Sequence, residues 1–503
     1  MSRKESAPVI PLLLLPLFLS FGRAYSCLED PAEAYRLSGA VCRLTYPAAA
    51  VLNEKTTKVI EAAFQHARYP SMQGEKSLLL IGKVSFGLEN LEIHNLSIGR
   101  SEFELVPGKG IALKISNVSA VFKGTIQYGY GSWLVNLAQS LDLEIESQID
   151  LGINPRLYCG KGKVAADTSD CYLRFHKLRL HLQGDKEPNW LKKLFTDFIT
   201  FTVKLVVKGQ ICKEINKLAD ILSDFIQDTA AHFLSDGDIS VDISVTTAPA
   251  ITANYIESYH KGLTNYNNTT SALNESAFHP SQLTEDRMLF FWFSDELFNP
   301  LIAAAHHDGR FHLNVSAGEL SELLKTSLSN VTVDSIQRCL DAASAQLRVW
   351  SSSVPHLRTS NTGSRVTAQA CGELHCGGQG PPALFFETSV LVDVTASYAD
   401  KKLFLHGSPK KISVLQAEIP SQNKALQDEA QVSFIKEAVE KVGIPKVLSV
   451  LQVEITRLLD KQGANLFDII DPEVLPRDGF TVTKMDFGFP HHLLVDFLQK
   501  TLQ

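Results

Sequence analysis

The sequence of 503 residues lacks an excess of basic residues, since 48 Lys and Arg stand against 55 Asp and Glu, for a formal net charge of −7. Nucleic-acid binding depends on Lys and Arg that neutralise phosphates, so a nucleic acid is not expected as a partner. The same balance argues against a mainly electrostatic attachment to anionic membranes. After residue 26 there is also no run of about 18 uncharged apolar residues, so we expect no membrane-spanning segment.

Catalytic motifs are missing as well. The chain contains no G-x-S-x-G, H-E-x-x-H, Walker loop or G-x-G-x-x-G. The pairs His306–His307 and His491–His492 are neighbours in sequence, which do not face one site on a helix. Glu144 and Glu146 lie on the outer face of a predicted strand, where they are expected to aid solubility. An enzyme is therefore not expected, and a lipid esterase remains the alternative of another class.

Cysteine is scarce, with eight residues in the chain. The spacing Cys371-Gly-Glu-Leu-His-Cys376 fits no standard zinc finger, so we predict no metal site. Residues 1–26 combine a basic start, an apolar core and the small-residue pattern Ala24-Tyr25-Ser26, which is typical of a secretory signal peptide. We expect a secreted, extracellular protein in which cysteines form disulfides.

Glycosylation sequons fit the same compartment, because each marks a plausible surface position in a secreted chain. The asparagines of these sequons are Asn95, Asn117, Asn267, Asn268, Asn274, Asn314 and Asn330.

Long alternating segments dominate the pattern. Apolar residues alternate with polar ones from Leu141 to Ile153, from Ile111 to Ile115 and from Leu178 to Leu182. This period of two predicts long antiparallel strands with one buried face, and hence a strongly curved sheet. Val390–Val394 and Lys401–Leu405 show the same signal further along.

Helical periodicity occurs in few places, each of them long. We predict helices over 49–67, over 190–233 with Gly209 as a candidate break, and over 434–459 with a kink before Pro445. In each half, a long helix is followed by an Asp–Gly pair and then by a strand. The pairs are Asp236–Gly237 and Asp478–Gly479. In the second half the helix is expected to run through Leu466–Val474. This repeat indicates one α+β fold that occurs twice.

The predicted domain limits follow from this repeat. After the signal peptide, an N-terminal domain covers 27–260, a polar linker without periodicity covers 261–287, and a C-terminal domain covers 288–489. The Ser-, Gly- and Pro-rich segment 351–382 is predicted to be an exposed loop.

The last segment, 490–503, is predicted to be an amphipathic helix that begins at Pro490. Its apolar face covers more than half of the helix and must be buried against something. That face consists of Leu493, Leu494, Val495, Phe497, Leu498 and Leu502. A curved sheet wrapped on a helix can enclose an elongated apolar space, which suits a lipid, although the same residues could simply fill a core.

Several blocks of the sequence resemble the lipid-transfer and lipopolysaccharide-binding family, whose members include bactericidal/permeability-increasing protein. They include GAVCRLTYPAAAVLNEKTTKVIEAAFQ, DCYLRFHKLRLHLQG, VKGQICKEIN, LSDGDISVDIS, LFDIIDPEVLPRDGF and MDFGFPHHLLVDFLQ. The resemblance spans nearly the whole chain after residue 26 and is weakest from about Phe311 to Leu384.

The resemblance implies an elongated boomerang of two similar barrels, each a curved antiparallel sheet wrapped on a long helix. A central sheet would join the barrels, and the C-terminal amphipathic helix would cover a tunnel mouth as a lid. The implied function is exchange of cholesteryl ester and triglyceride between high-density and lower-density plasma lipoproteins, by a monomer that holds neutral lipid and phospholipid and needs no cofactor. Phospholipid transfer or lipopolysaccharide binding is the alternative within the family.

The resemblance also implies particular residues. It pairs Cys171 with Cys212 in a disulfide, and it places Gln227, Ser258 and His260 where they would meet polar atoms of lipid in the tunnel. Thr229 departs from the family pattern, which has a basic residue at this position, so a charge-assisted phospholipid contact is not expected there.

Overall fold

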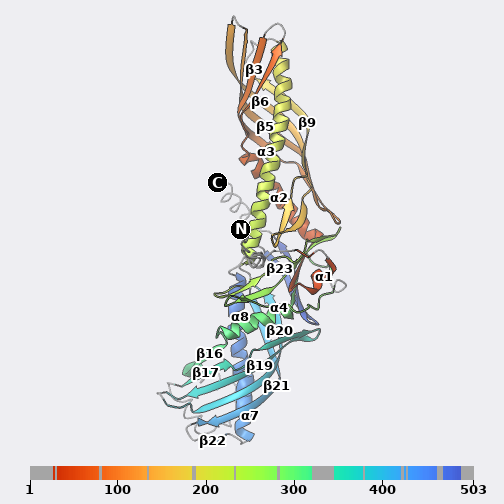
Figure 1. Cartoon of the computed structure of the whole chain (residues 1–503). Coiled ribbons are helices and arrows are strands. Elements are labelled where there is room, and N and C mark those ends of the chain that lie inside the picture. The colour runs from red at the N-terminus through yellow and green to blue at the C-terminus, as the bar shows by residue number, and fades with distance from the viewer. Residues whose placement is uncertain are drawn as a thin grey trace, which may run out of the picture.

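The computed structural model describes residues 27–28, 31–78, 82–132, 135–183, 189–231, 234–279, 284–319, 345–377, 380–400, 402–420, 424–425, 429–460 and 468–488. Figure 1 shows an elongated molecule with a sheet and a long helix at each end and a third sheet between them. Mostly antiparallel strands, together with a few long helices, place the chain in the α+β class.

The N-terminal sheet has the strand order β2-β3-β5-β6-β9, with β4 paired to β5. Its strands are β2 (Met72–Leu78), β3 (Gly82–Ser97), β4 (Arg100–Val106), β5 (Gly110–Ser132), β6 (Val135–Ile153) and β9 (Cys171–Leu182). Leu143, Ile145 and Ile149 of β6 are buried, whereas Glu146 and Gln148 are exposed. The predicted alternation is therefore confirmed, and it gives this sheet one dry face.

Two helices pack on that dry face, α2 (Tyr46–His66) and α3 (Asn189–Ala231). The 43 residues of α3 are continuous through Gly209, which contradicts the predicted break. Gly209 lies on the exposed face, so it costs only about 1 kcal/mol of helix propensity. Burial of Ile199, Val203 and Ile211 against the sheet outweighs that cost.

Disulfides reinforce the N-terminal half. Cys171 at the start of β9 is bonded to Cys212 of α3, which is the pair that the resemblance implied. Closing the sequence separation of 41 residues is worth roughly 3–4 kcal/mol in the chain-entropy model. A second disulfide joins Cys27 to Cys159, in the hairpin of β7 (Arg156–Gly160) and β8 (Lys163–Asp167).

The C-terminal sheet has the order β16-β17-β19-β20-β21-β22, with β18 paired to β19. Its strands are β16 (His312–Ser316), β17 (Gln346–Ser351), β18 (His356–Ser360), β19 (Gly363–His375), β20 (Leu384–Ala399), β21 (Lys402–Ile419) and β22 (Lys424–Ala425). The loop predicted over 351–382 is thus wrong, because β18 and β19 lie within it. Pairing of β19 with β17 on one side and with the long strand β20 on the other overrides its loop-like composition.

The helix that packs on this sheet consists of α7 (Glu429–Ala438), a π-helical turn η3 (Val439–Gly443) and α8 (Ile444–Asp460). The Ile444 amide donates to the Val439 carbonyl, five residues back. Pro445 has no amide hydrogen for the regular helical bond, so the expected irregularity before it takes the form of this π turn.

The central sheet combines strands from both halves in the order β11-β12-β1-β15-β24-β23. These strands are β11 (Ala250–Ile251), β12 (Tyr255–His260), β1 (Ala40–Thr45), β15 (Leu289–Ser294), β24 (Phe480–Gly488) and β23 (Asp468–Arg477). The expected helix through Leu466–Val474 is wrong for its described part, because β23 begins at Asp468. Pro472 and Pro476 are unsuited to a helix interior but are tolerated in this edge strand.

The segment predicted to be a polar linker, 261–287, is not free of regular structure. It contains β13 (Leu263–Tyr266) and β14 (Thr269–Thr270), which form a three-stranded sheet with β10 (Ile239–Asp242) in the order β10-β13-β14. Asn267 and Asn268 form the turn between β13 and β14, both with positive φ, so the polar composition reflects a tight hairpin. The remaining described helices are α1 (Pro31–Arg36) and α4 (Asp295–His307), which follows β15.

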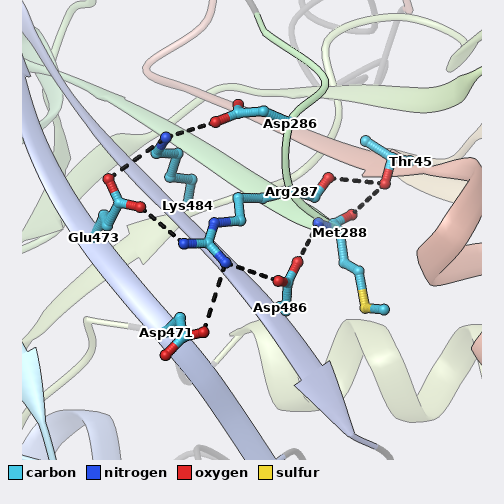
Figure 2. A network of polar contacts seen from close by, with 8 residues as sticks. All are labelled: Thr45, Asp286, Arg287, Met288, Asp471, Glu473, Lys484 and Asp486. Carbon is cyan, nitrogen blue, oxygen red and sulfur yellow. Dashed lines mark hydrogen bonds and ion pairs between the residues drawn. The ribbon is translucent and has the colours of Figure 1, made fainter.

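A polar network holds the end of that segment to the central sheet, as Figure 2 shows. The Arg287 guanidinium donates to Asp486 at 2.9 Å and to Glu473 at 3.0 Å. Lys484 donates to Asp286 at 2.7 Å, and the Thr45 hydroxyl donates to the Arg287 carbonyl at 2.9 Å. The hydrogen bond from Arg287 lowers the pKa of Glu473, so this carboxylate stays charged and the chain is fixed where it passes between the halves.

The centre of the sheet contains a buried ion pair. Arg43 of β1 lies opposite Glu257 of β12, and its guanidinium donates to that carboxylate at 2.8 Å. Tyr259 donates to Glu257 at 2.7 Å and Tyr35 donates to the same oxygen. Burial, together with the charge of Glu257, raises the pKa of both tyrosines above the usual range. Both tyrosines therefore stay protonated and donate hydrogen bonds to the Glu257 carboxylate, as Arg43 does.

We expect the Arg43→Met substitution to lower the free energy of unfolding by about 3–5 kcal/mol, because it leaves the buried Glu257 side chain without its cationic partner. The double variant Arg43→Met/Glu257→Leu should recover part of that loss. Urea unfolding followed by circular dichroism measures both. Lys123→Met removes an exposed ion pair with Glu144 and is the control, with an expected change below about 1 kcal/mol. Equal stabilities of Arg43→Met and wild type would contradict the importance of the pair.

Candidate functional site

An apolar cavity of about 320 Å³ lies in the C-terminal half. Its walls are strands β16, β17, β19 and β20 on one side and α7, η3 and α8 on the other. Val366 and Ala368 of β19 point into it, together with Val390 and Val392 of β20. Their neighbours Arg365, Thr367 and Gln369 are exposed, so the period of two separates a polar outer face from an apolar lining.

Helix α8 forms the side on which the cavity opens. Val447 and Val450 line the cavity, yet they are 38% and 40% exposed. The Leu448 side chain, which also lines the cavity, packs on Gly407 of β21, where even a Cβ would come within 2.4 Å of a Leu448 methyl carbon. The helix is thus fastened to β21 while its apolar stripe remains accessible, which is the arrangement of a cavity mouth.

The charged groups of the lining are both paired with carboxylates. Lys446 lies 2.8 Å from Glu319, which follows β16. Arg310, just before β16, donates to Asp236 at 2.7 Å and to Asp308 at 2.7 Å. Because Asp236 precedes β10, the Arg310 pair joins the two halves of the chain beside the cavity. The lining can offer a ligand extensive apolar contact and few free polar groups.

The central sheet has two unlike faces. Val41, Phe290 and Trp292 are buried in a core on one face. The alternate residues Phe291 and Phe293 are only partly buried, and their rings stack 5.8 Å apart. This second face is therefore apolar and partly accessible.

Three of its residues form a polar chain, namely Cys42, Ser258 and His260. The Ile243 carbonyl can only accept, so Nδ1 of His260 donates to it at 2.8 Å. Nε2 of the neutral imidazole then accepts from the Ser258 hydroxyl at 2.9 Å. Burial lowers the pKa of His260, which keeps the ring neutral. Desolvation, together with the charge of Glu257, raises the pKa of the Cys42 thiol to about 12.

The structure brings Ser258 and His260 together, as two of the three polar residues expected in the tunnel. The third, Gln227, is on α3, whose residues 221–231 carry no described side chains, and the same holds for Thr229. The predicted terminal helix, 490–503, lies outside the described residues. Six of the seven sequon asparagines are exposed, and Asn330 lies outside the described residues.

The residues that line the C-terminal cavity were not predicted as site residues from the sequence. Alternation from Val390 to Val394 predicted a strand but gave no sign that its apolar face lines an open space. The pair Cys371 and Cys376 is not a metal site, because Cys376 is disulfide-bonded. Within the described part of the chain there is no cluster of three or more His, Cys, Asp or Glu side chains suited to a metal ion. None of the described helices is long and apolar enough to cross a membrane.

Comparison with known proteins decides the family. The model of the LBP / BPI / CETP family, N-terminal domain, matches residues 50–227, and the model of its C-terminal domain matches residues 234–374. The chain belongs to the LBP / BPI / CETP family. The resemblance seen in the sequence blocks is thereby confirmed, and the two matched domains lie on the two halves of the structure.

Within the LBP / BPI / CETP family, the chain is 45% identical to the cholesteryl ester transfer protein of Homo sapiens, over 98% of this chain and 99% of that protein. It is 41% identical to the cholesteryl ester transfer protein of Gallus gallus, over 97% of each chain. The lipopolysaccharide-binding protein of Mus musculus is 23% identical over 55% of this chain and 57% of that protein. Similarity to the first group therefore includes both ends of the chain.

A crystal structure of lipopolysaccharide binding protein matches with a TM-score of 0.50 and 16% identity, over 90% of this chain and 99% of that one. This match shows the fold of the LBP / BPI / CETP family, with two domains and curled sheets.

A substitution that fills the cavity tests whether it holds ligand. In Ala368→Phe the new ring points into the cavity, whereas in Thr367→Phe it points to solvent from the same strand. We expect Ala368→Phe to retain about half or less of the lipid that co-purifies with wild type, because the ring occupies ligand space. Thr367→Phe should retain all of it. Lipid extraction with mass spectrometry gives the ratio, and equal lipid content of the two variants would exclude the cavity as a binding site.

Proposed function

We propose that this protein carries cholesteryl ester and triglyceride, with some phospholipid, between plasma lipoproteins of the high-density and lower-density classes. The observation that carries the proposal is 45% identity to a cholesteryl ester transfer protein along 98% of the chain. The apolar cavity supports it, because a neutral lipid needs burial and few polar contacts. In transfer of this kind, lipid moves down its concentration gradient and no covalent bond is formed or broken. No cofactor or energy source is needed.

The proposal includes an interior path. Each half, 27–260 and 288–489, would form a barrel in an elongated boomerang, and the segment 261–287 would connect them. The partly accessible face of the central sheet, with Phe291 and Phe293, supports a continuous apolar passage. Ser258 and His260 would meet ester or phospholipid oxygens there. Gln227 would do the same from α3.

Secretion into plasma is part of the same proposal, and the protein would act there as a monomer. Disulfides such as Cys27–Cys159 are characteristic of extracellular proteins. The exposed sequon asparagines, which include Asn117 and Asn314, are accessible to glycosylation.

A transfer assay with the full chain tests the function. Donor particles carry labelled cholesteryl ester, and acceptor particles are separated from them after incubation. We expect intact ester in the acceptor. Tight capture of one anionic lipid without ester exchange would favour a lipopolysaccharide- or phospholipid-binding protein. The hydrogen-bonded Ser258 and His260 make an esterase worth excluding, and free cholesterol with fatty acid in the products would indicate one.

The C-terminal segment would be the lid of this path. Its six apolar side chains offer about 1.5–3 kcal/mol each when fully buried, which partial burial and ordering reduce to a few kcal/mol in total. Such a helix can dock and open again.

We expect deletion of residues 493–503 to abolish transfer of neutral lipid while the circular dichroism spectrum and the unfolding midpoint stay unchanged. A truncated chain that fails to fold would instead indicate a permanently packed helix.

A further inference from the structure

The outward face of α3 is unlike the surface of an ordinary amphipathic helix. The helix buries Ile199, Val203 and Val207 against the N-terminal sheet. On the opposite side Phe201 is 68% exposed and Leu205 is 56% exposed. Residues four apart are neighbours on a helix, so these two side chains form one apolar patch. Phe201 is the most exposed large hydrophobic side chain in the described part of the chain.

Lysines border this patch. Lys204 and Lys208 lie on the same face and are exposed, and among the described residues neither has a carboxylate partner. Three more lysines of α3 are exposed, namely Lys193, Lys213 and Lys217. The acidic residues in the same described part of the helix are the exposed Asp197 and Asp220 and the partly buried Glu214. Although the chain as a whole has a net charge of −7, this face is locally basic.

The form of α3 also matters for what it can contact. Its 43 residues make a rod about 65 Å long. In Figure 1 this rod extends along the N-terminal half. No described element covers Phe201 or Leu205, since these side chains are largely exposed. A rod with a protruding aromatic side chain and lysines beside it fits a broad, soft surface better than a pocket in a protein.

We propose that the face of α3 formed by Phe201, Lys204, Leu205 and Lys208 docks the protein on the anionic phospholipid surface of a lipid particle. Phe201 and Leu205 enter the boundary between head groups and acyl chains, and the lysines bind the phosphates. This inference rests on the proposed function, because a lipid carrier must stop on a lipid surface to load and unload. It assigns that contact to a surface distinct from the apolar cavity.

The apolar part is tested with the full chain and a double variant, Phe201→Ser/Leu205→Ser. The probe is vesicles of phosphatidylcholine with roughly one-fifth phosphatidylserine, separated by flotation. We expect affinity for these vesicles to fall at least about tenfold, because two insertable side chains are lost. Val453→Ser, which removes a side chain that is 61% exposed on α8, is the matched control and should bind as wild type does.

The charged part is tested with Lys204→Glu/Lys208→Glu. This variant should lose affinity for the vesicles that contain phosphatidylserine, and its binding should depend less on salt than that of wild type. Its binding to vesicles of pure phosphatidylcholine should change little.

Wild-type affinity of the Phe201→Ser/Leu205→Ser variant would overturn the inference. Wild-type vesicle affinity together with a shift from dimer to monomer in sedimentation would instead make this face a contact between two copies. Ester transfer is measured separately. If wild type transfers no ester but vesicle binding depends on Phe201, the proposed function fails and the docking surface stands. If wild type transfers ester and the variant binds vesicles normally, only the docking surface fails.

Discussion

The buried pair of Arg43 and Glu257 is the constraint on which the central sheet depends. Arg43 and Glu257 face each other across β1 and β12, on the buried side of the central sheet. The Arg43 guanidinium also lies 3.8 Å from the centre of the Tyr255 ring and donates to the Thr284 carbonyl. A shift of one residue between these strands would remove the contact of Arg43 with the Tyr255 ring. It would also leave the charged groups of Arg43 and Glu257 without partners. The pair therefore selects one register between β1 and β12, within the sheet that joins the halves.

That register also decides what the other face of the sheet presents. With Arg43 and Glu257 on the buried side, Cys42, Ser258 and His260 must lie on the opposite side, beside Phe291 and Phe293. The result is a mostly apolar surface with one short polar chain, already satisfied by the Ile243 carbonyl. Such a surface can contact a lipid ester without forming strong hydrogen bonds to the ester oxygens. The cavity in the C-terminal half continues this chemistry, since its two charged residues, Arg310 and Lys446, are held by carboxylates.

Much of the fold could be predicted from the sequence, because alternation in β6 and helical periodicity in α3 are long signals. The errors have physical causes. Gly209 did not break α3, since packing of its neighbours outweighs a weak propensity. The segment 351–382 looked like a loop because serine and glycine are common there, although strand pairing makes β18 and β19 of it. The cavity could not be predicted, because alternation gives the inward face of a strand but does not tell whether that face meets a side chain or a space.

The central claim is that neutral lipid occupies the apolar interior. Its most direct test is extraction of lipid from the purified full chain, followed by mass spectrometry and quantification per mole of protein. Occupation by neutral lipid predicts cholesteryl ester or triglyceride together with phospholipid, in amounts comparable to the protein. Protein free of neutral lipid, or protein with a single anionic lipid alone, would contradict the claim.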